Sequence, residues 1–179
     1  TLLNTVASKV DTYMEVGCAL GATFCATIKN NKLDAVAIDN WEVNIQPDRK
    51  DLESLPTNSF FKFEENLASV NTESTVKIIN ENLFSVDLAP YNETIQMWFY
   101  DGPHDEMVTT NAVKKYASCF AKEAVLIFDD ANWKGVVDGA RAGINAAGLK
   151  VSYEKIILNE QEDPNGWWNG LYVVVVNKD

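Results

Sequence analysis

Short apolar stretches alternate with amphipathic stretches along most of the chain, which is typical of a parallel sheet covered by helices. Seven stretches are rich in β-branched and aromatic residues and are predicted to be strands. They comprise residues 12–16, 34–38, 75–79, 95–100, 124–128, 151–158 and 171–177. Most of the first five are almost continuously apolar, which indicates strands with helices on both faces.

The segments between these strands show the spacing of amphipathic helices. Phe60, Phe63 and Leu67, for example, recur at intervals of three and four residues and form one apolar face. Gly148 stands where the C-cap of a helix is expected. Helices are predicted over residues 21–30, 60–70, 105–122 and 135–147.

The last two predicted strands are joined by residues 159–169, which contain Pro164, Asn165 and Gly166. This connection is too short for a crossover helix, so the two strands should form an antiparallel hairpin. The polar residues 43–57 are predicted to be a loop after the second strand. The chain is therefore predicted to be one α/β domain over residues 1–179, with a seven-stranded, mainly parallel sheet that ends in an antiparallel hairpin and has helices on both faces.

Composition excludes several classes of function. The chain has 26 acidic and 15 basic residues, a net charge of −11, whereas nucleic-acid and anionic-membrane binding need clustered Lys and Arg. No apolar stretch approaches the roughly 20 residues that span a bilayer. Three cysteines show no metal-ligand spacing, so reduced thiols and a cytoplasmic location are expected.

The first predicted strand leads from Glu15 into a turn that contains Gly17 and Gly21. Glycines at a strand–helix turn let the backbone approach a ligand, and the helix that follows supplies free N–H groups. A dinucleotide fingerprint needs a third glycine, which disfavours a nicotinamide-dependent dehydrogenase. Asp39 follows 18 residues after Gly21, where nucleotide-binding sheets place the acid that binds ribose. Trp41 is a candidate for stacking on an adenine or for simple packing.

Acidic residues also end the fourth and fifth predicted strands. Asp101 and His104 follow the fourth strand, and Asp129 and Asp130 follow the fifth. In a doubly wound sheet these strand ends open on the same crevice as the glycine turn. Converging carboxylates repel one another unless a cation or protonation relieves them, and oxygen ligands suit Mg²⁺, Ca²⁺ or Mn²⁺. The alternative is that the aspartates cap the helices that follow.

The spacing Glu15-x-Gly17-x-x-x-Gly21 followed by Asp39 resembles the cofactor motifs of class I S-adenosylmethionine (SAM)-dependent methyltransferases. The resemblance covers residues 12–177 and implies a Rossmann-like sheet with the same terminal hairpin. It implies that Gly17 and Gly21 flank the methionine part of SAM, that Glu15 lies near the amino group and that Asp39 binds the ribose. The cofactor-binding residues that we expect are Glu15, Gly17, Cys18, Gly21, Asp39, Asn40, Trp41, Asn82 and Asp101.

Two positions depart from this family pattern. Cys18 lies in a turn that often contains another glycine, and its thiol is interpreted as a small filler rather than a nucleophile. Asn82 stands where the family often has an aspartate near the adenine, so its amide would have to make that contact.

The run from Asp101 to His104, together with the Asp129–Asp130 pair, resembles a metal-dependent subgroup that includes macrocin O-methyltransferases and cephalosporin-hydroxylase-like proteins. This resemblance implies that Asp101, Asp129 and Asp130 hold a divalent metal, with Mg²⁺ expected, that positions a substrate hydroxyl. Asp101 and His104 are the expected catalytic residues, since an imidazole suits a general base near neutral pH. His104 is also a candidate for a structural role or for a fourth metal ligand.

The sequence therefore predicts a SAM-dependent methyltransferase that O-methylates a small, hydroxylated, sugar-like acceptor with the help of a metal. A metal-independent methyltransferase of the same fold and a non-catalytic cofactor-binding module are the alternatives. Trp167 and Trp168 are candidates for an acceptor pocket or for the contact of a homodimer. Gly135, Gly139 and Gly143 are predicted to allow close packing against the sheet or another helix.

Overall fold

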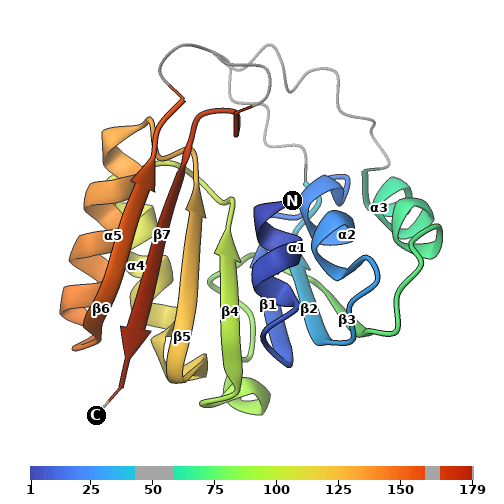
Figure 1. Ribbon diagram of the computed structural model, residues 1–179, viewed down its shortest axis with the longest axis horizontal. Coiled ribbons are helices and arrows are strands. Elements are labelled where there is room, and N and C mark those ends of the chain that lie inside the picture. Colours follow the sequence, from blue (N-terminus) through green and yellow to red (C-terminus); the bar gives the residue numbers. More distant parts are fainter. Residues whose placement is uncertain (43–58, 160–165, 179) are drawn as a thin grey trace.

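The computed structural model describes residues 1–42, 59–159 and 166–178. Within these residues it shows one seven-stranded sheet in the order β3-β2-β1-β4-β5-β7-β6 (Figure 1). β1 to β5 run parallel, and β7 runs antiparallel to both β5 and β6, so the predicted sheet and its hairpin are confirmed. The strands are β1 (Thr12–Val16), β2 (Asp34–Asp39), β3 (Thr75–Asn80), β4 (Ile95–Tyr100), β5 (Phe120–Asp129), β6 (Lys150–Ile157) and β7 (Leu171–Asn177).

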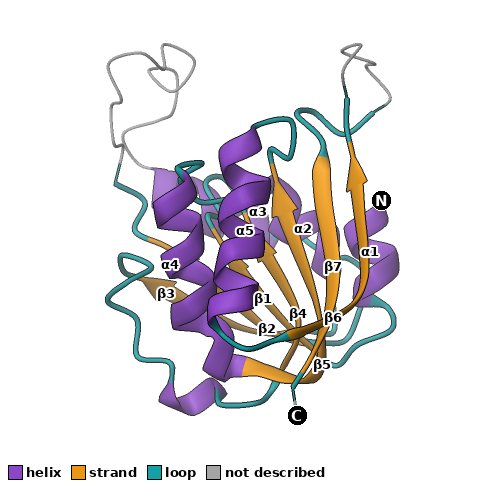
Figure 2. Ribbon diagram, turned by 90° about the vertical axis from the view of Figure 1, so that its left-hand side faces the viewer, coloured by secondary structure: helices purple, strands orange, loops and turns teal. Residues whose placement is uncertain are grey.

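Helices cover both faces of the sheet. α4 and α5 pack on one face, and α1 and α2 lie on the other (Figure 2). Among the described residues, no helix combines the length and the apolar character that a membrane crossing requires. The helices are α1 (Leu2–Ala7), α2 (Ala22–Ile28), α3 (Ser59–Ala68), α4 (Glu106–Tyr116) and α5 (Lys134–Ala146), with short 3₁₀ turns at Ala89–Tyr91 and Ala117–Cys119.

Aromatic side chains fill the core on both faces of the sheet. Under α4 and α5, the fully buried ring of Trp98 lies 5.4 Å from Tyr100 and 5.5 Å from Tyr116, centroid to centroid. On the opposite face, Phe24 of α2 stacks on Tyr13 of β1 at 5.7 Å. Large rings bury much apolar surface, and here they attach each helix layer to the middle strands.

The register of the parallel strands brings the predicted site residues to one edge of the sheet. Val16 of β1 pairs with Ile38 of β2 and with Tyr100 of β4, and Tyr100 pairs in turn with Phe128 of β5. The residues that follow these positions therefore lie side by side at the carboxyl ends of the strands. They are Gly17, Asp39, Asp101 and Asp129.

Two details of the predicted elements are corrected. The helix expected over residues 105–122 ends at Tyr116, and β5 begins at Phe120 rather than at 124. The reason is tertiary, because Phe120 is buried and pairs with Ile95 of β4. The N-terminal helix α1 was not predicted, and the loop expected over residues 43–57 lies outside the described residues.

The glycine stripe of α5, which consists of Gly135, Gly139 and Gly143, packs against α4. A Cβ atom at Gly139 would lie 2.5 Å from the carbonyl oxygen of Glu106, and one at Gly143 would lie 2.6 Å from the Cβ of Val113. The hydroxyl of Thr110 also donates to the carbonyl of Gly139 at 3.2 Å. The stripe therefore brings the backbones of α4 and α5 into close contact. Of the two packing partners predicted for it, the sheet or another helix, the structure shows the helix.

We predict that Gly139→Ala destabilises the protein. Alanine is favoured over glycine in a helix by about 1 kcal/mol, so propensity alone would make this variant more stable. The new methyl group would instead meet the backbone of Glu106, and overpacking of this kind costs about 1–3 kcal/mol. Urea unfolding measures the balance, and a gain in stability would show that the two helices do not touch at this point.

Candidate active site

The turn between β1 and α2 contains three residues with left-handed backbone. Gly17 and Gly21 have φ of +89° and +85°, and Ala19 between them has φ of +44°. A Cβ atom at Gly17 would lie 1.9 Å from the carbonyl oxygen of Asp101, so the turn rests directly on the end of β4. Glycine is required at this position both for its φ and for this close approach.

The end of β2 holds the same turn in place. The backbone N–H of Ala19 donates to Oδ2 of Asp39 at 2.8 Å, and the N–H of Trp41 donates to Oδ1 at 2.8 Å. The indole N–H of Trp41 then donates to the carbonyl of Ala19 at 2.7 Å. Asp39 and Trp41 thus brace the turn, while each carboxylate oxygen of Asp39 keeps a second lone pair for a ligand.

Glu15 lies beneath the turn and is fully buried. Its Oε1 accepts a hydrogen bond from the hydroxyl of Thr23 at 2.6 Å, and its Oε2 accepts one from the hydroxyl of Tyr13. Burial raises the pKa of Glu15 to about 8, although both hydroxyl donors act to lower it. The structure therefore places Glu15 in a network with Tyr13 and Thr23, two partners that the sequence motifs did not reveal.

A second group of side chains converges where β4 and β5 end. Ligand atoms of Asp101, His104 and Asp130 all lie within 4.8 Å of one another. His104 Nε2 is 2.5 Å from Oδ2 of Asp130, and the His104 ring meets Trp133 edge to face at 4.3 Å. Asp130 is only 6% exposed and has φ of +58°, which is unusual for a residue with a side chain. Backbone strain of this kind is often found at functional sites.

Asp129 was predicted to share the metal with Asp101 and Asp130, but it lies outside this group of three. Its Oδ1 accepts hydrogen bonds from the indole N–H of Trp167 at 2.7 Å and from the backbone N–H of Asp130 at 2.8 Å. Asn169, on the same turn as Trp167, donates to Oδ1 of Asp130 at 2.8 Å. The sequence pointed to Trp167 but not to Asn169.

The site is crowded with carboxyl groups whose ionisation is disfavoured. Burial, followed by repulsion from Asp129 and Asp130, raises the pKa of Asp101 well above its usual range. Burial also raises the pKa of Asp129 to about 6, although the hydrogen bond from Trp167 opposes the shift. A cation bound among these carboxylates would favour their ionised forms and lower both pKa values.

The remaining predicted cofactor residues lie at the same edge of the sheet but make local contacts. Cys18 is buried in the turn and lies 3.8 Å from the carbonyl of Glu15. Asn40 is hydrogen-bonded to Glu42, and Asn82 accepts from the N–H of Phe84 at 2.9 Å in a tight turn after β3. These contacts leave the roles of the three residues as predictions.

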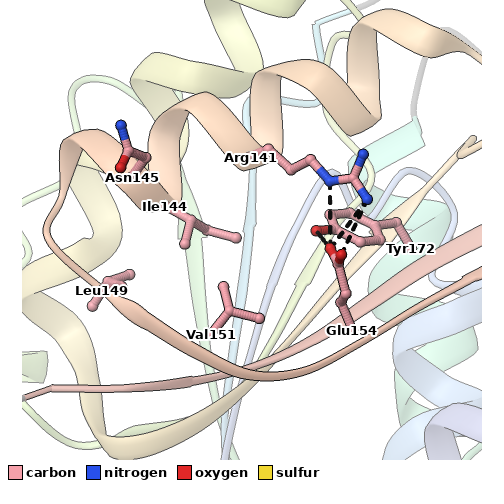
Figure 3. Close-up of a pocket in the computed structure, with 7 residues that line it drawn as sticks. All are labelled: Arg141, Ile144, Asn145, Leu149, Val151, Glu154 and Tyr172. Atoms are coloured by element: carbon pink, nitrogen blue, oxygen red, sulfur yellow. Dashed lines mark hydrogen bonds and ion pairs between the residues drawn. The ribbon is translucent and has the colours of Figure 1, made fainter.

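A cavity of about 260 Å³ lies elsewhere, between α5, β6 and β7 (Figure 3). Arg141 points across it toward Glu154 at 3.2 Å, and the hydroxyl of Tyr172 donates to the same carboxylate at 2.6 Å. The charges in this cavity are therefore already paired, and none of the predicted site residues lines it.

Comparison with known proteins decides the family. A family model described as a methyltransferase domain matches residues 14–131, which include the glycine turn and all four strand-end aspartates. The chain belongs to this family. It is a SAM-dependent methyltransferase. The search of curated protein sequences found no match.

Solved structures share the fold of this methyltransferase. M. jannaschii TYW2 in complex with AdoMet is 10% identical, with a TM-score of 0.63 over 99% of this chain and 74% of that one. The 1,6-didemethyltoxoflavin-N1-methyltransferase of Burkholderia thailandensis is 7% identical, with a TM-score of 0.60 over 99% and 76%. The N-methyltransferase NodS of Bradyrhizobium japonicum is 13% identical, with a TM-score of 0.59 over 99% and 90%.

We predict that Gly17→Ala is far more damaging to this methyltransferase than Gly148→Ala. Both glycines have positive φ, which costs an alanine about 1–2 kcal/mol. At Gly148 nothing lies within 4 Å of the added Cβ, whereas at Gly17 it would overlap the carbonyl of Asp101. Urea unfolding should show that Gly17→Ala costs about 2 kcal/mol more. Equal losses would contradict the contact between the turn and β4.

We also predict that Glu15 makes the stability of the methyltransferase pH-dependent. Since its pKa rises from 4.5 to about 8 on folding, the native state holds a proton that the unfolded chain releases between these values. This contribution to stability is complete below about pH 4.5 and is lost as the pH rises through 8. Glu15→Gln should flatten the dependence of unfolding free energy on pH over this range. The exposed Glu64→Gln is the control, and an unchanged slope in Glu15→Gln would refute the assignment.

Proposed function

We propose that this methyltransferase transfers the methyl group of SAM to a hydroxyl of a small, sugar-like acceptor, assisted by a divalent ion such as Mg²⁺ or Mn²⁺. The observation that carries the proposal is the convergence of Asp101, His104 and Asp130 at the strand edge that also bears the glycine turn. Methyl donor and acceptor must meet at one place, and Gly17 touches Asp101 there. The proposal agrees with the metal-dependent O-methyltransferase subgroup that the sequence resembles.

The glycine turn is the proposed binding place for SAM. Gly17 and Gly21 would let the backbone approach the methionine part, and Asp39 at the end of β2 would accept hydrogen bonds from the ribose. The neighbouring structure of TYW2 is a complex with AdoMet, and the Burkholderia enzyme holds S-adenosylhomocysteine, which supports this use of the fold. The buried acids nearby complement the positive sulfonium.

The three converging side chains fit a divalent ion. The two carboxylates suit Mg²⁺ or Mn²⁺, and the repulsion between them favours a cation at this point. The imidazole of His104 would add a nitrogen ligand. Asp101, His104 and Asp130 would hold the ion, in place of the predicted set that included Asp129. When bound, it would lower the pKa of a coordinated hydroxyl.

His104 supports a second candidate, a metal-independent reaction with a histidine base. Because Nε2 faces Oδ2 of Asp130 at 2.5 Å, the neutral imidazole keeps its proton on Nε2 and has a lone pair on Nδ1. That nitrogen would accept the proton of the acceptor hydroxyl, while Asp130 fixes the orientation of the ring. In both candidates the chain contributes by positioning the hydroxyl in line with the methyl group.

Metal dependence separates the two candidates. We expect calorimetry to show S-adenosylhomocysteine binding, and Mn²⁺ titration followed by electron paramagnetic resonance to show one bound ion. Asp101→Asn and Asp130→Asn should each weaken Mn²⁺ binding by about tenfold or more, since each removes a charged ligand. Methyl transfer to a panel of hydroxylated sugars should stop in EDTA and return with Mg²⁺ or Mn²⁺.

Asp105→Asn is the matched control. Asp105 caps α4 by accepting from the N–H groups of Met107 and Val108, and asparagine caps helices equally well. The control should keep wild-type Mn²⁺ affinity. Transfer that persists in EDTA and disappears in His104→Ala would support the histidine base and contradict the metal. Absence of S-adenosylhomocysteine binding would contradict the proposed cofactor site itself.

A further inference from the structure

The turn at residues 166–170, which leads into β7, contacts the aspartate pair at the end of β5. Its Trp167 donates through the indole N–H to Oδ1 of Asp129 at 2.7 Å, and its Asn169 donates through the side-chain amide to Oδ1 of Asp130 at 2.8 Å. These contacts join residues 38 and 39 positions apart in the chain. One turn therefore holds both carboxylates.

The backbone of this turn is itself fixed to the end of β5. The antiparallel pairing of β5 with β7 extends as far as Asp129 and Leu171. Beyond this pair, the N–H of Asn132 donates to the carbonyl of Asn169 at 2.7 Å. Trp167 also packs edge to face against Phe99 of β4, with centroids 6.3 Å apart. The amide of Asn169 is thus held at a defined place beside Asp130.

Asn169, Asp130 and His104 form a continuous chain of contacts. Asn169 occupies Oδ1 of Asp130, and His104 Nε2 lies at Oδ2. Because Asp130 is 6% exposed, few water molecules can replace either partner. The Asp130 carboxylate is held at both oxygens and so has one orientation. That orientation determines the orientation of the His104 ring.

We propose that Asn169 is a positioning residue of the methyltransferase, which acts by fixing the Asp130 carboxylate and, through it, the ring of His104, with Trp167 anchoring the turn that carries it. This inference rests on the proposed function in that it gives His104 and Asp130 a part in the reaction. It holds for both the metal-assisted and the metal-independent candidate, because each needs the imidazole in one orientation. Partners of this kind affect metal affinity or activity by about 10–100-fold.

The single histidine of the sequence makes the inference directly testable. In protein labelled with ¹⁵N, the imidazole signals in nuclear magnetic resonance spectra come from His104 alone. At a pH at which the ring is neutral, we expect the wild-type protein to show one tautomer, with its proton on Nε2. In Asn169→Ala the Asp130 carboxylate loses the hydrogen bond from the Asn169 amide, so we expect a mixture of tautomers and a Mn²⁺ affinity weaker by about tenfold or more.

Two further variants separate positioning from general damage to the turn. Trp168→Ala is the control, since this neighbouring side chain is 70% exposed, and its imidazole spectrum should match that of the wild type. Trp167→Phe keeps a six-membered aromatic ring that can pack against Phe99 and removes the N–H that binds Asp129, together with part of the ring surface. It should shift the same His104 signals to a smaller extent, and it keeps the test available if Asn169→Ala fails to fold.

The outcomes distinguish this inference from the proposed function. If Asn169→Ala folds and retains the wild-type imidazole spectrum, or if Trp168→Ala changes the spectrum as much, the positioning role is refuted. If the wild-type protein binds no Mn²⁺, the metal part of the proposed function fails. The spectra of His104 would still decide the role of Asn169 in that case.

Discussion

The structure depends on the parallel pairing of β1 with β4, which makes Gly17 leave the sheet beside Asp101. Their backbones lie so close that no side chain fits between them. The glycine turn follows β1, and the residues from Asp101 to His104 follow β4, so one backbone contact sets the distance between the two halves of the candidate site. Asp39 and Trp41 hold the other side of the turn, and the strained φ of Ala19 persists because both of its polar backbone groups are bound.

The electrostatics of the site follow from this crowding. Glu15, Asp101 and Asp129 are withdrawn from water and lie near one another, which raises the pKa of each carboxyl group. Ionising these buried groups costs free energy in the protein without a ligand, and a bound cation would offset that cost. SAM carries a positive sulfonium, and a divalent ion would add further positive charge. Some of the acidic residues of the chain therefore lie where cationic ligands would bind, while many of the others are exposed on the surface.

Most of the fold could be predicted from the sequence, because strands buried on both faces are continuous apolar stretches and the last connection is too short for a helix. The strand-end positions of Glu15, Asp39, Asp101 and Asp130 followed from the same pattern. The start of β5 could not be predicted, since Ala121–Glu123 suits a helix and only the pairing of Phe120 with β4 makes it a strand. The contacts of Trp167 and Asn169 likewise depend on the register of β5 with β7, which leaves no local signal.

The glycine stripe of α5 has a mechanical consequence. Where two helices meet backbone to backbone, no layer of adaptable side chains separates them, so a slide of one along the other would drive carbonyl groups into Cα atoms. α4 and α5 should therefore move as a single stiff body. His104 and Asp130 lie just before the first turns of these two helices, and Gly135 itself rests on the carbonyl of His104. A rigid pair of α4 and α5 would thereby keep the spacing of His104 and Asp130 constant.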